Sequence, residues 1–223
     1  MNVHARRLMS LSLFFVLVFS GFMGLLAEEA PSLEIIQAAR KGICDFSGME
    51  ALPGQLSAAA SHKAAWDDAE VHHGFQVYTV SPVELMRGTD LTPLLTPTGL
   101  WRFVVLAEGQ PVSLVTVAQV EGKWTAVSVG GAILAGEVSR VMEKWPVKDG
   151  YSHRFLRVYQ ARADFIEIFR DNRSIGFVPL IAARETFGIT GGLDPAAVLH
   201  DSEVLKSLKH IVYQRMTGIE NRK

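Results

Sequence analysis

The hydrophobic pattern divides the chain into one long apolar run and a series of shorter periodic segments. The run extends from Leu8 to Ala27 without a charged residue, and Arg6 and Arg7 precede it. A basic start, an apolar stretch and a small residue before a polar boundary are typical of a secretory signal. We therefore predict that residues 1–27 are a signal peptide and that the remaining chain is exported.

An uncleaved membrane anchor is the alternative for the same run. At about 1.5 Å of rise per residue, a helix over it would cross a bilayer core of roughly 30 Å. Leu25 also stands where a cleavage site usually has a second small residue. A cleaved signal is favoured over an anchor. Both place the chain from Glu28 onward outside the cytoplasm, in the periplasm or elsewhere in a bacterial envelope.

Apolar residues recur at helical spacing in three longer segments. Pro31–Phe46 is predicted to be a helix, and Ile133–Trp145 is predicted to be an amphipathic helix that ends before Pro146. Ser202 is predicted to cap the last helix. Shorter helices are expected at Val83–Met86, at Ala182–Phe187, and from Asp194 to about His200.

Alternating apolar and polar positions predict a strand over residues 74–80 and six further strands. Short glycine-containing gaps separate several of them, which is typical of β-hairpins. The six strands fall into two groups: Leu100–Ala107, Val112–Val120 and Trp124–Val129, then Arg154–Gln160, Asp164–Phe169 and Ser174–Val178. We predict an α+β fold whose antiparallel sheet is built from two three-stranded β sets with flanking helices. The pattern leaves open whether the two sets form one sheet or two.

Composition shifts divide the chain into three parts. After residues 1–27, residues 28–73 are predicted to hold the N-terminal helix and an irregular segment, and residues 74–223 to form a compact α+β domain. Within the second part, the stretch from Ser47 to Ala65 is rich in small residues and predicts either a linker or a second helix.

The net charge bears on which partners the protein binds, and the cysteine count bears on whether disulfides stabilise it. The chain has 22 basic and 23 acidic residues, a formal net charge of −1, which gives no electrostatic reason to expect a nucleic-acid partner. A membrane is expected as a partner only through an uncleaved N-terminal segment. The single cysteine, Cys44, excludes an intramolecular disulfide. Its position between Ile43 and Phe46 predicts a buried small hydrophobic residue.

Motifs for hydrolysis and for cofactor binding are absent from the sequence. It contains no Gly-x-Ser-x-Gly and no His-Glu-x-x-His, and we expect no cofactor. The densest polar cluster consists of Asp67, Asp68, Glu70, His72 and His73. Because adjacent strand residues point to opposite faces, the two histidines are predicted not to share a metal ion.

Arginine is concentrated in the second β set, in a stretch from Tyr151 to Thr190 that has no lysine. The planar guanidinium offers a fixed fork of donors to carboxylates and phosphates. Arg157 is unusual because strand alternation places it on the face of two aromatic residues, Phe155 and Tyr159. Ordinary pairing with nearby acidic residues is the alternative. The predicted ligand-binding residues are Arg154, Arg157, Arg162, Arg170 and Arg173, and Arg184 lies in the same stretch.

These features support three hypotheses of function. The first is an exported, non-catalytic binding module of the cell envelope that recognises a protein partner or a small ligand. The second is an exported hydrolase-type enzyme whose site is assembled from distant residues, with Cys44, His72, His73 and His153 as candidates. The third is an envelope scaffold protein held by an uncleaved anchor. The first is favoured because the chain has an ordinary core and no catalytic motif.

Overall fold

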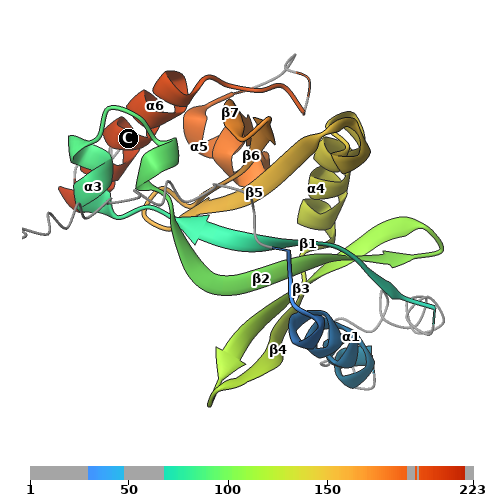
Figure 1. Cartoon of the computed structure of the whole chain (residues 1–223). Helices are drawn as coiled ribbons and strands as arrows, with labels where there is room; N and C mark the ends of the chain where they lie inside the picture. The colour runs from blue at the N-terminus through green and yellow to red at the C-terminus, as the bar shows by residue number, and fades with distance from the viewer. Residues whose placement is uncertain (1–29, 48–67, 190–193, 195, 219–223) are drawn as a thin grey trace, which may run out of the picture.

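The structure is a computed structural model that describes residues 30–47, 68–189, 194 and 196–218 (Figure 1). The predicted signal or anchor, nearly all of the stretch from Ser47 to Ala65, and Gly191-Gly192 lie outside the described residues. None of the described helices is long and apolar enough to cross a membrane.

The described strands form one seven-stranded sheet in the order β4-β3-β2-β1-β5-β6-β7. Neighbouring strands are antiparallel except β1 and β5, which are parallel. The predicted α+β fold with an antiparallel sheet is confirmed. The division into two three-stranded sets is not, because β1 lies in the middle and pairs with a strand of each group. The strands are β1 (Glu70–Thr79), β2 (Thr96–Ala107), β3 (Gln110–Val120), β4 (Lys123–Gly130), β5 (Tyr151–Val158), β6 (Ala163–Arg170) and β7 (Arg173–Pro179).

Five α-helices lie among the described residues, and they match the predicted helical segments closely. Two short 3-10 turns, η1 (Thr92–Leu94) and η2 (Val147–Asp149), precede β2 and β5. The helices are α1 (Leu33–Ser47), α3 (Pro82–Arg87), α4 (Ala132–Lys144), α5 (Ile181–Phe187) and α6 (Asp201–Met216).

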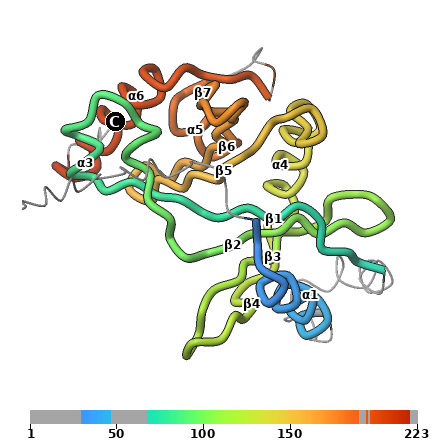
Figure 2. Tube along the Cα trace, viewed as in Figure 1, coloured from blue at the N-terminus to red at the C-terminus, as the bar shows by residue number. Residues whose placement is uncertain are grey.

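The two faces of the sheet carry different helices (Figure 1). α4 packs on the face that presents Phe75, Val104 and Phe155, which we call the α4 face. The opposite face, which we call the α6 face, packs against α3 and α6 around Phe165 and Phe177. On β2 and β3 that same face is covered by α1. Figure 2 shows how the chain leaves β4, passes through α4 and returns to β5 beside β1.

Residues with positive φ close the hairpins. The turn after β2 has φ of 50° and 74° at Glu108 and Gly109, and the turn after β3 has 51° and 77° at Glu121 and Gly122. Two consecutive residues in this conformation match the right-handed twist of the flanking strands. The glycine-containing gaps therefore predicted these hairpins correctly. The turn between β6 and β7 uses the same conformation without glycine, at Asp171-Asn172.

The segment before α6 differs from its prediction. The helix expected from Asp194 to about His200 is wrong, because Leu199 instead bridges Phe177 of β7. Their backbone groups exchange two hydrogen bonds, of 2.8 and 2.9 Å. Gly176 makes room for this contact, since a Cβ there would lie 2.3 Å from the carbonyl oxygen of Leu199. The unpaired edge of β7 offers these hydrogen bonds, and they outweigh the local helix signal.

The start of α6 also differs in one detail. His200, and not Ser202, is its N-cap. The Ser202 backbone N–H donates to His200 Nδ1 at 3.4 Å, while the Glu203 carboxylate accepts from the His200 backbone N–H at 3.1 Å. This is the reciprocal geometry of a capping box, with an imidazole where serine or threonine is usual.

Candidate functional site

A β-bulge in β1 turns two histidines toward the same side of the sheet. Between Val71 and Gly74, β1 has one residue more than the facing segment of β2. Val71 packs on the α6 face and Phe75 on the α4 face, although residues four apart share a face in a regular strand. The extra residue places both His72 and His73 on the α4 face, where their rings stack with centroids 4.8 Å apart. The prediction that they point to opposite faces is therefore wrong.

Gly74 allows the bulge to lie tightly against β2. A Cβ at this position would come within 2.2 Å of the Phe103 ring, which is 1% exposed. A larger residue would displace a buried aromatic side chain directly beside the two histidines. The glycine is thus required by packing and not by its backbone angles.

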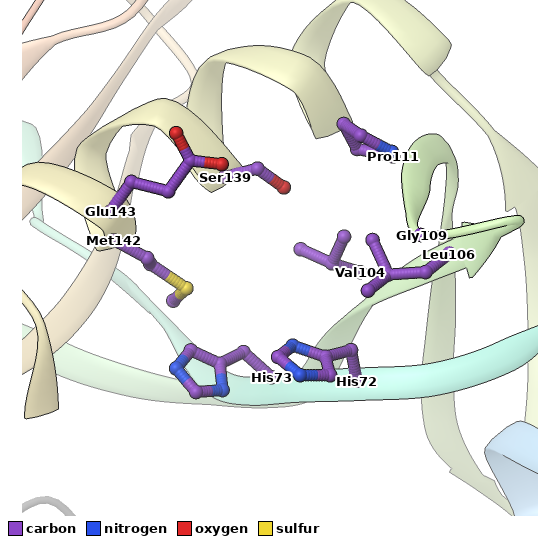
Figure 3. A pocket seen from close by; sticks show the side chains of 9 residues that line it. All are labelled: His72, His73, Val104, Leu106, Gly109, Pro111, Ser139, Met142 and Glu143. Atoms are coloured by element: carbon purple, nitrogen blue, oxygen red, sulfur yellow. The ribbon is translucent and has the colours of Figure 1, made fainter. Parts of the chain in front are cut away.

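The two imidazoles line one wall of a pocket of about 170 Å³ on the α4 face (Figure 3). Ser139 and Glu143 of α4 lie on the opposite wall, four residues apart and hence one above the other on the helix. We call this cavity the histidine pocket. Its remaining lining is mostly apolar and comes from β2, the following turn, β3 and α4: Val104, Leu106, Gly109, Pro111 and Met142.

Burial favours the neutral form of His73, which lines the pocket, and of His153 on β5. It lowers the pKa of His73, and the neighbouring His72 lowers it further. His153 of β5 is 3% exposed, and burial lowers its pKa to about 4. A hydrogen bond to the backbone of Trp145 opposes that shift, and His73 adds to it. At neutral pH, His73 and His153 are therefore uncharged, and each can both donate and accept a hydrogen bond.

The pocket contains residue types found in hydrolytic and metal sites, but not their geometry. In Figure 3 the Ser139 hydroxyl and the Glu143 carboxylate lie across the cavity from the rings of His72 and His73. A nucleophile and its base need to lie within hydrogen-bond reach, and no such bond joins these walls in the described part of the chain. Among the described residues, no three His, Cys, Asp or Glu side chains are placed to hold a metal ion.

The structure brings together only part of the predicted catalytic set. His72, His73 and His153 gather on the α4 face. Cys44 lies on α1, which packs on the other face, and its side chain is exposed. The predicted burial of Cys44 is therefore wrong. α1 turns the preceding residue, Ile43, toward the sheet, and the next position along a helix points about 100° away from it.

The five predicted ligand-binding arginines do not share one surface. Arg154 is on the α6 face, is 5% exposed, and forms a 3.1 Å ion pair with Glu167 of β6. Its guanidinium lies over the rings of Tyr78 and Phe169, 5.0 and 4.3 Å from their centroids. The Thr92 hydroxyl donates to the same Glu167 carboxylate. Arg154 is thus part of the core.

Arg157 lies on the α4 face, as strand alternation predicted. Its Nη1 is 3.8 Å from Asp164 Oδ2, and its guanidinium lies 5.6 Å from the centroid of the Tyr159 ring. Arg102 of β2, which the sequence analysis did not select, lies on the same face and interacts electrostatically with both Arg157 and Asp164. Strand alternation indicates this position, because Arg102 lies two residues before Val104, which is buried on the α4 face.

The other arginines lie at the ends of the strands. Arg162 is exposed in the turn after β5. Arg170 and Arg173 are exposed and face each other at the β6–β7 turn, where Arg170 donates to the Tyr151 hydroxyl at 3.3 Å. In the described part of the chain, no ion pair or ring contact links these three arginines to Arg157 or Asp164.

Arg184 of α5 belongs to a separate structural contact. It forms an ion pair with Glu137 of α4, which is 6% exposed, and also donates to the Pro179 carbonyl at 2.8 Å. The same Glu137 carboxylate accepts a 2.6 Å hydrogen bond from the backbone N–H of Ile181, at the start of α5. This contact connects α4 to α5.

Comparison of the chain with protein-family models, with curated proteins and with solved structures found no match. Functional inference therefore rests on the residues themselves. The best-formed candidate is the histidine pocket, because it is concave, mostly apolar, and presents a few polar groups from two walls.

Proposed function

We propose that this chain is a non-catalytic binding module of the cell envelope and that it holds a small ligand in the histidine pocket. One observation carries the proposal: the bulge in β1 aims two adjacent imidazoles into a single cavity, opposite a hydroxyl and a carboxylate. β-bulges often re-aim side chains at functional sites. Export of the chain remains a proposal drawn from its first 27 residues.

The lining favours a ligand with a polar group at each end. Glu143 and Ser139 suit a group that donates hydrogen bonds, such as an amine or a hydroxyl. The imidazoles of His72 and His73 suit a second polar group at the other end. Between these ends, Val104 and the other apolar residues favour a short hydrocarbon or ring segment.

Binding is favoured over hydrolysis by the separation of the polar groups. A hydrolase using Ser139 would need an imidazole within hydrogen-bond reach to take its proton, and the two lie on opposite walls. The hydrolase hypothesis keeps one supporting observation, which is that three histidines gather near one cavity. It predicts slow turnover of an ester or amide that requires Ser139.

A thermal-shift screen of the purified protein tests the proposal. The panel contains divalent metals, anions, peptides and amine- or hydroxyl-bearing metabolites. A ligand that binds only the folded state, at about 100 times its dissociation constant, adds roughly 2.7 kcal/mol of stability. We expect a thermal shift with one of the small polar molecules. Incubation with ester or amide compounds should release no product.

Two substitutions locate the binding site of a hit. His73→Ala and Glu143→Gln each remove a polar group from one wall of the pocket, and we expect either to abolish the shift. His210→Ala is the matched control, because His210 is an exposed histidine of α6 and does not line the pocket. A shift that survives both pocket variants would contradict the proposal. A mature N-terminus at Glu28 in soluble envelope fractions would support export and exclude the anchored scaffold.

A further inference from the structure

A second polar group lies on the α4 face, outside the histidine pocket. It consists of Arg102 of β2, Arg157 of β5 and Asp164 of β6, which interact electrostatically with one another. The Arg102 guanidinium lies 4.9 Å from the centroid of the Phe155 ring. Because Phe155 and Arg157 are two residues apart on the same strand, they share a face. Arg102 therefore reaches across β1 to the strand that carries Arg157.

The charges of this group do not balance, because two guanidinium groups share one carboxylate. Asp164 is 7% exposed, and its nearest cation is Arg157 at 3.8 Å. Burial lowers the pKa of Arg102, Asp164 raises it, and Arg157 lowers it. The two arginines therefore repel each other, and the group has an excess of one positive charge on a partly buried surface.

The hydrogen bonds of the group are also incomplete. Arg102 Nε and Nη1 are buried and have no hydrogen-bond partner among the residues that the structure describes. Asp164 Oδ1 is in the same situation. Buried donors without partners cost free energy, and native proteins usually satisfy them. An arginine with two such donors, beside a second arginine, is the arrangement expected where an anion completes the contacts.

We propose that Arg102 and Arg157 form an anion-binding site that takes a carboxylate or phosphate group of a small ligand. Both anions match the planar fork of a guanidinium and accept charge-assisted hydrogen bonds from it. Access is through Arg157, whose side chain is 37% exposed, and past Tyr159, which is 47% exposed. The bound anion supplies the negative charge that Asp164 alone does not. This site is independent of the histidine pocket, whose lining includes neither arginine.

Isothermal titration calorimetry on the purified protein at low ionic strength tests the proposal, with inorganic phosphate and succinate as probes. We expect saturable binding of at least one probe, and whichever binds identifies the favoured anion. Arg157→Gln and Arg102→Gln should each weaken binding about ten- to hundredfold, the usual range for loss of a charge-assisted hydrogen bond. Arg173→Gln is the matched control, because Arg173 is an exposed arginine at the start of β7, and it should leave the affinity unchanged.

Asp164→Asn provides a test in the opposite direction. If Asp164 competes with the ligand for the two arginines, removing its charge should strengthen anion binding several-fold. Thermal unfolding of each variant shows whether it is folded. If Arg102→Gln does not fold, the result for Arg157→Gln decides the test. Three results would overturn the proposal: no saturable heat with either probe, an equal loss in Arg173→Gln, or weaker binding in Asp164→Asn.

Discussion

Two arginine–carboxylate pairs on neighbouring positions of β5 and β6 face opposite sides of the sheet and have different surroundings. Arg154 and Glu167 are directly opposite each other across the two strands, and so are Arg157 and Asp164. On the α6 face, the side chains of the first pair are 6% and 0% exposed. On the α4 face, those of the second pair are 37% and 9% exposed. Each pair joins an arginine of β5 to a carboxylate directly opposite it on β6, and the two pairs differ in what packs on their face of the sheet.

The α6-face pair connects elements that are distant in the sequence. The hydroxyl of Thr92 in η1 lies within hydrogen-bond distance of both the Glu167 carboxylate and the Asp201 carboxylate of α6. Asp201 also accepts from the backbone N–H groups of Leu91 and Thr92, at 2.8 and 3.1 Å. A buried ion pair with such additional contacts is structural. The α4-face pair has no comparable enclosure, and its carboxylate faces a second arginine.

The largest predicted effect breaks the enclosed pair. Glu167→Gln leaves Arg154 buried without a counter-charge, and we expect a loss of about 3–5 kcal/mol in the free energy of unfolding. Urea unfolding at neutral pH measures it. Asp164→Asn is the matched change on the α4 face, and we expect a smaller loss there because water reaches Arg157.

A double variant shows whether the loss comes from an unpaired charge. Arg154→Met with Glu167→Leu removes both charges while filling similar volume, and we expect it to recover most of the stability lost in Glu167→Gln. If the double variant is as unstable as the single one, the pair contributes specific hydrogen bonds that an apolar replacement does not supply.

The sequence predicts the hairpins that join β2, β3 and β4 because their determinants are local. Glycine at the second turn position relieves the positive φ at Gly109 and Gly122, and the flanking residues alternate with period two. The same local logic placed Arg157 correctly on the face of Phe155. The same alternation places Arg102 on the face opposite Trp101, although Arg102 lies outside the arginine-rich stretch from Tyr151 to Thr190.

The candidate site depends on pairing between distant segments and could not be predicted from local pattern. His72 and His73 share a face only because β1 gains one residue relative to β2, and nothing in the local sequence states where that register shifts. The bridge from Leu199 to β7 is a similar case, since it depends on the open edge of a distant strand. Local periodicity therefore predicts most of the helices and strands, whereas bulges and edge contacts determine which side chains come together in the candidate site.

An intermediate effect comes from pH, because the α4 face also buries His153. Its pKa is lowered from the ordinary 6.5 to about 4 by burial. Above about pH 6.5 the imidazole is neutral in both states, and its contribution to stability is fully present. As pH falls from 6.5 to 4, the unfolded chain takes up the proton and the folded chain does not. We expect a loss of up to about 3 kcal/mol across that window.

A variant separates this effect from other titrations. Burial raises the pKa of Asp164 and of Glu167, so these groups change stability with the opposite sign as pH falls. His153→Gln keeps a hydrogen-bond donor for the backbone of Trp145 but cannot take up a proton. Urea unfolding at pH 7, 5.5 and 4 should show the wild type losing stability relative to this variant. Parallel pH profiles would mean that His153 is protonated in the folded protein.

The smallest predicted effect on stability concerns the open pair. Arg157→Gln removes a 3.8 Å ion pair and a contact with Tyr159 from a side chain that is 37% exposed. Exposed ion pairs contribute little, so we expect a loss of at most about 1 kcal/mol in urea unfolding. Arg154→Gln, the same substitution on the α6 face, should cost several times more because it leaves Glu167 buried without a cation. Equal losses would mean that the α4-face arginine is also held for stability. A negligible loss in Arg157→Gln, together with loss of anion binding, would mean that the open pair is kept for a ligand.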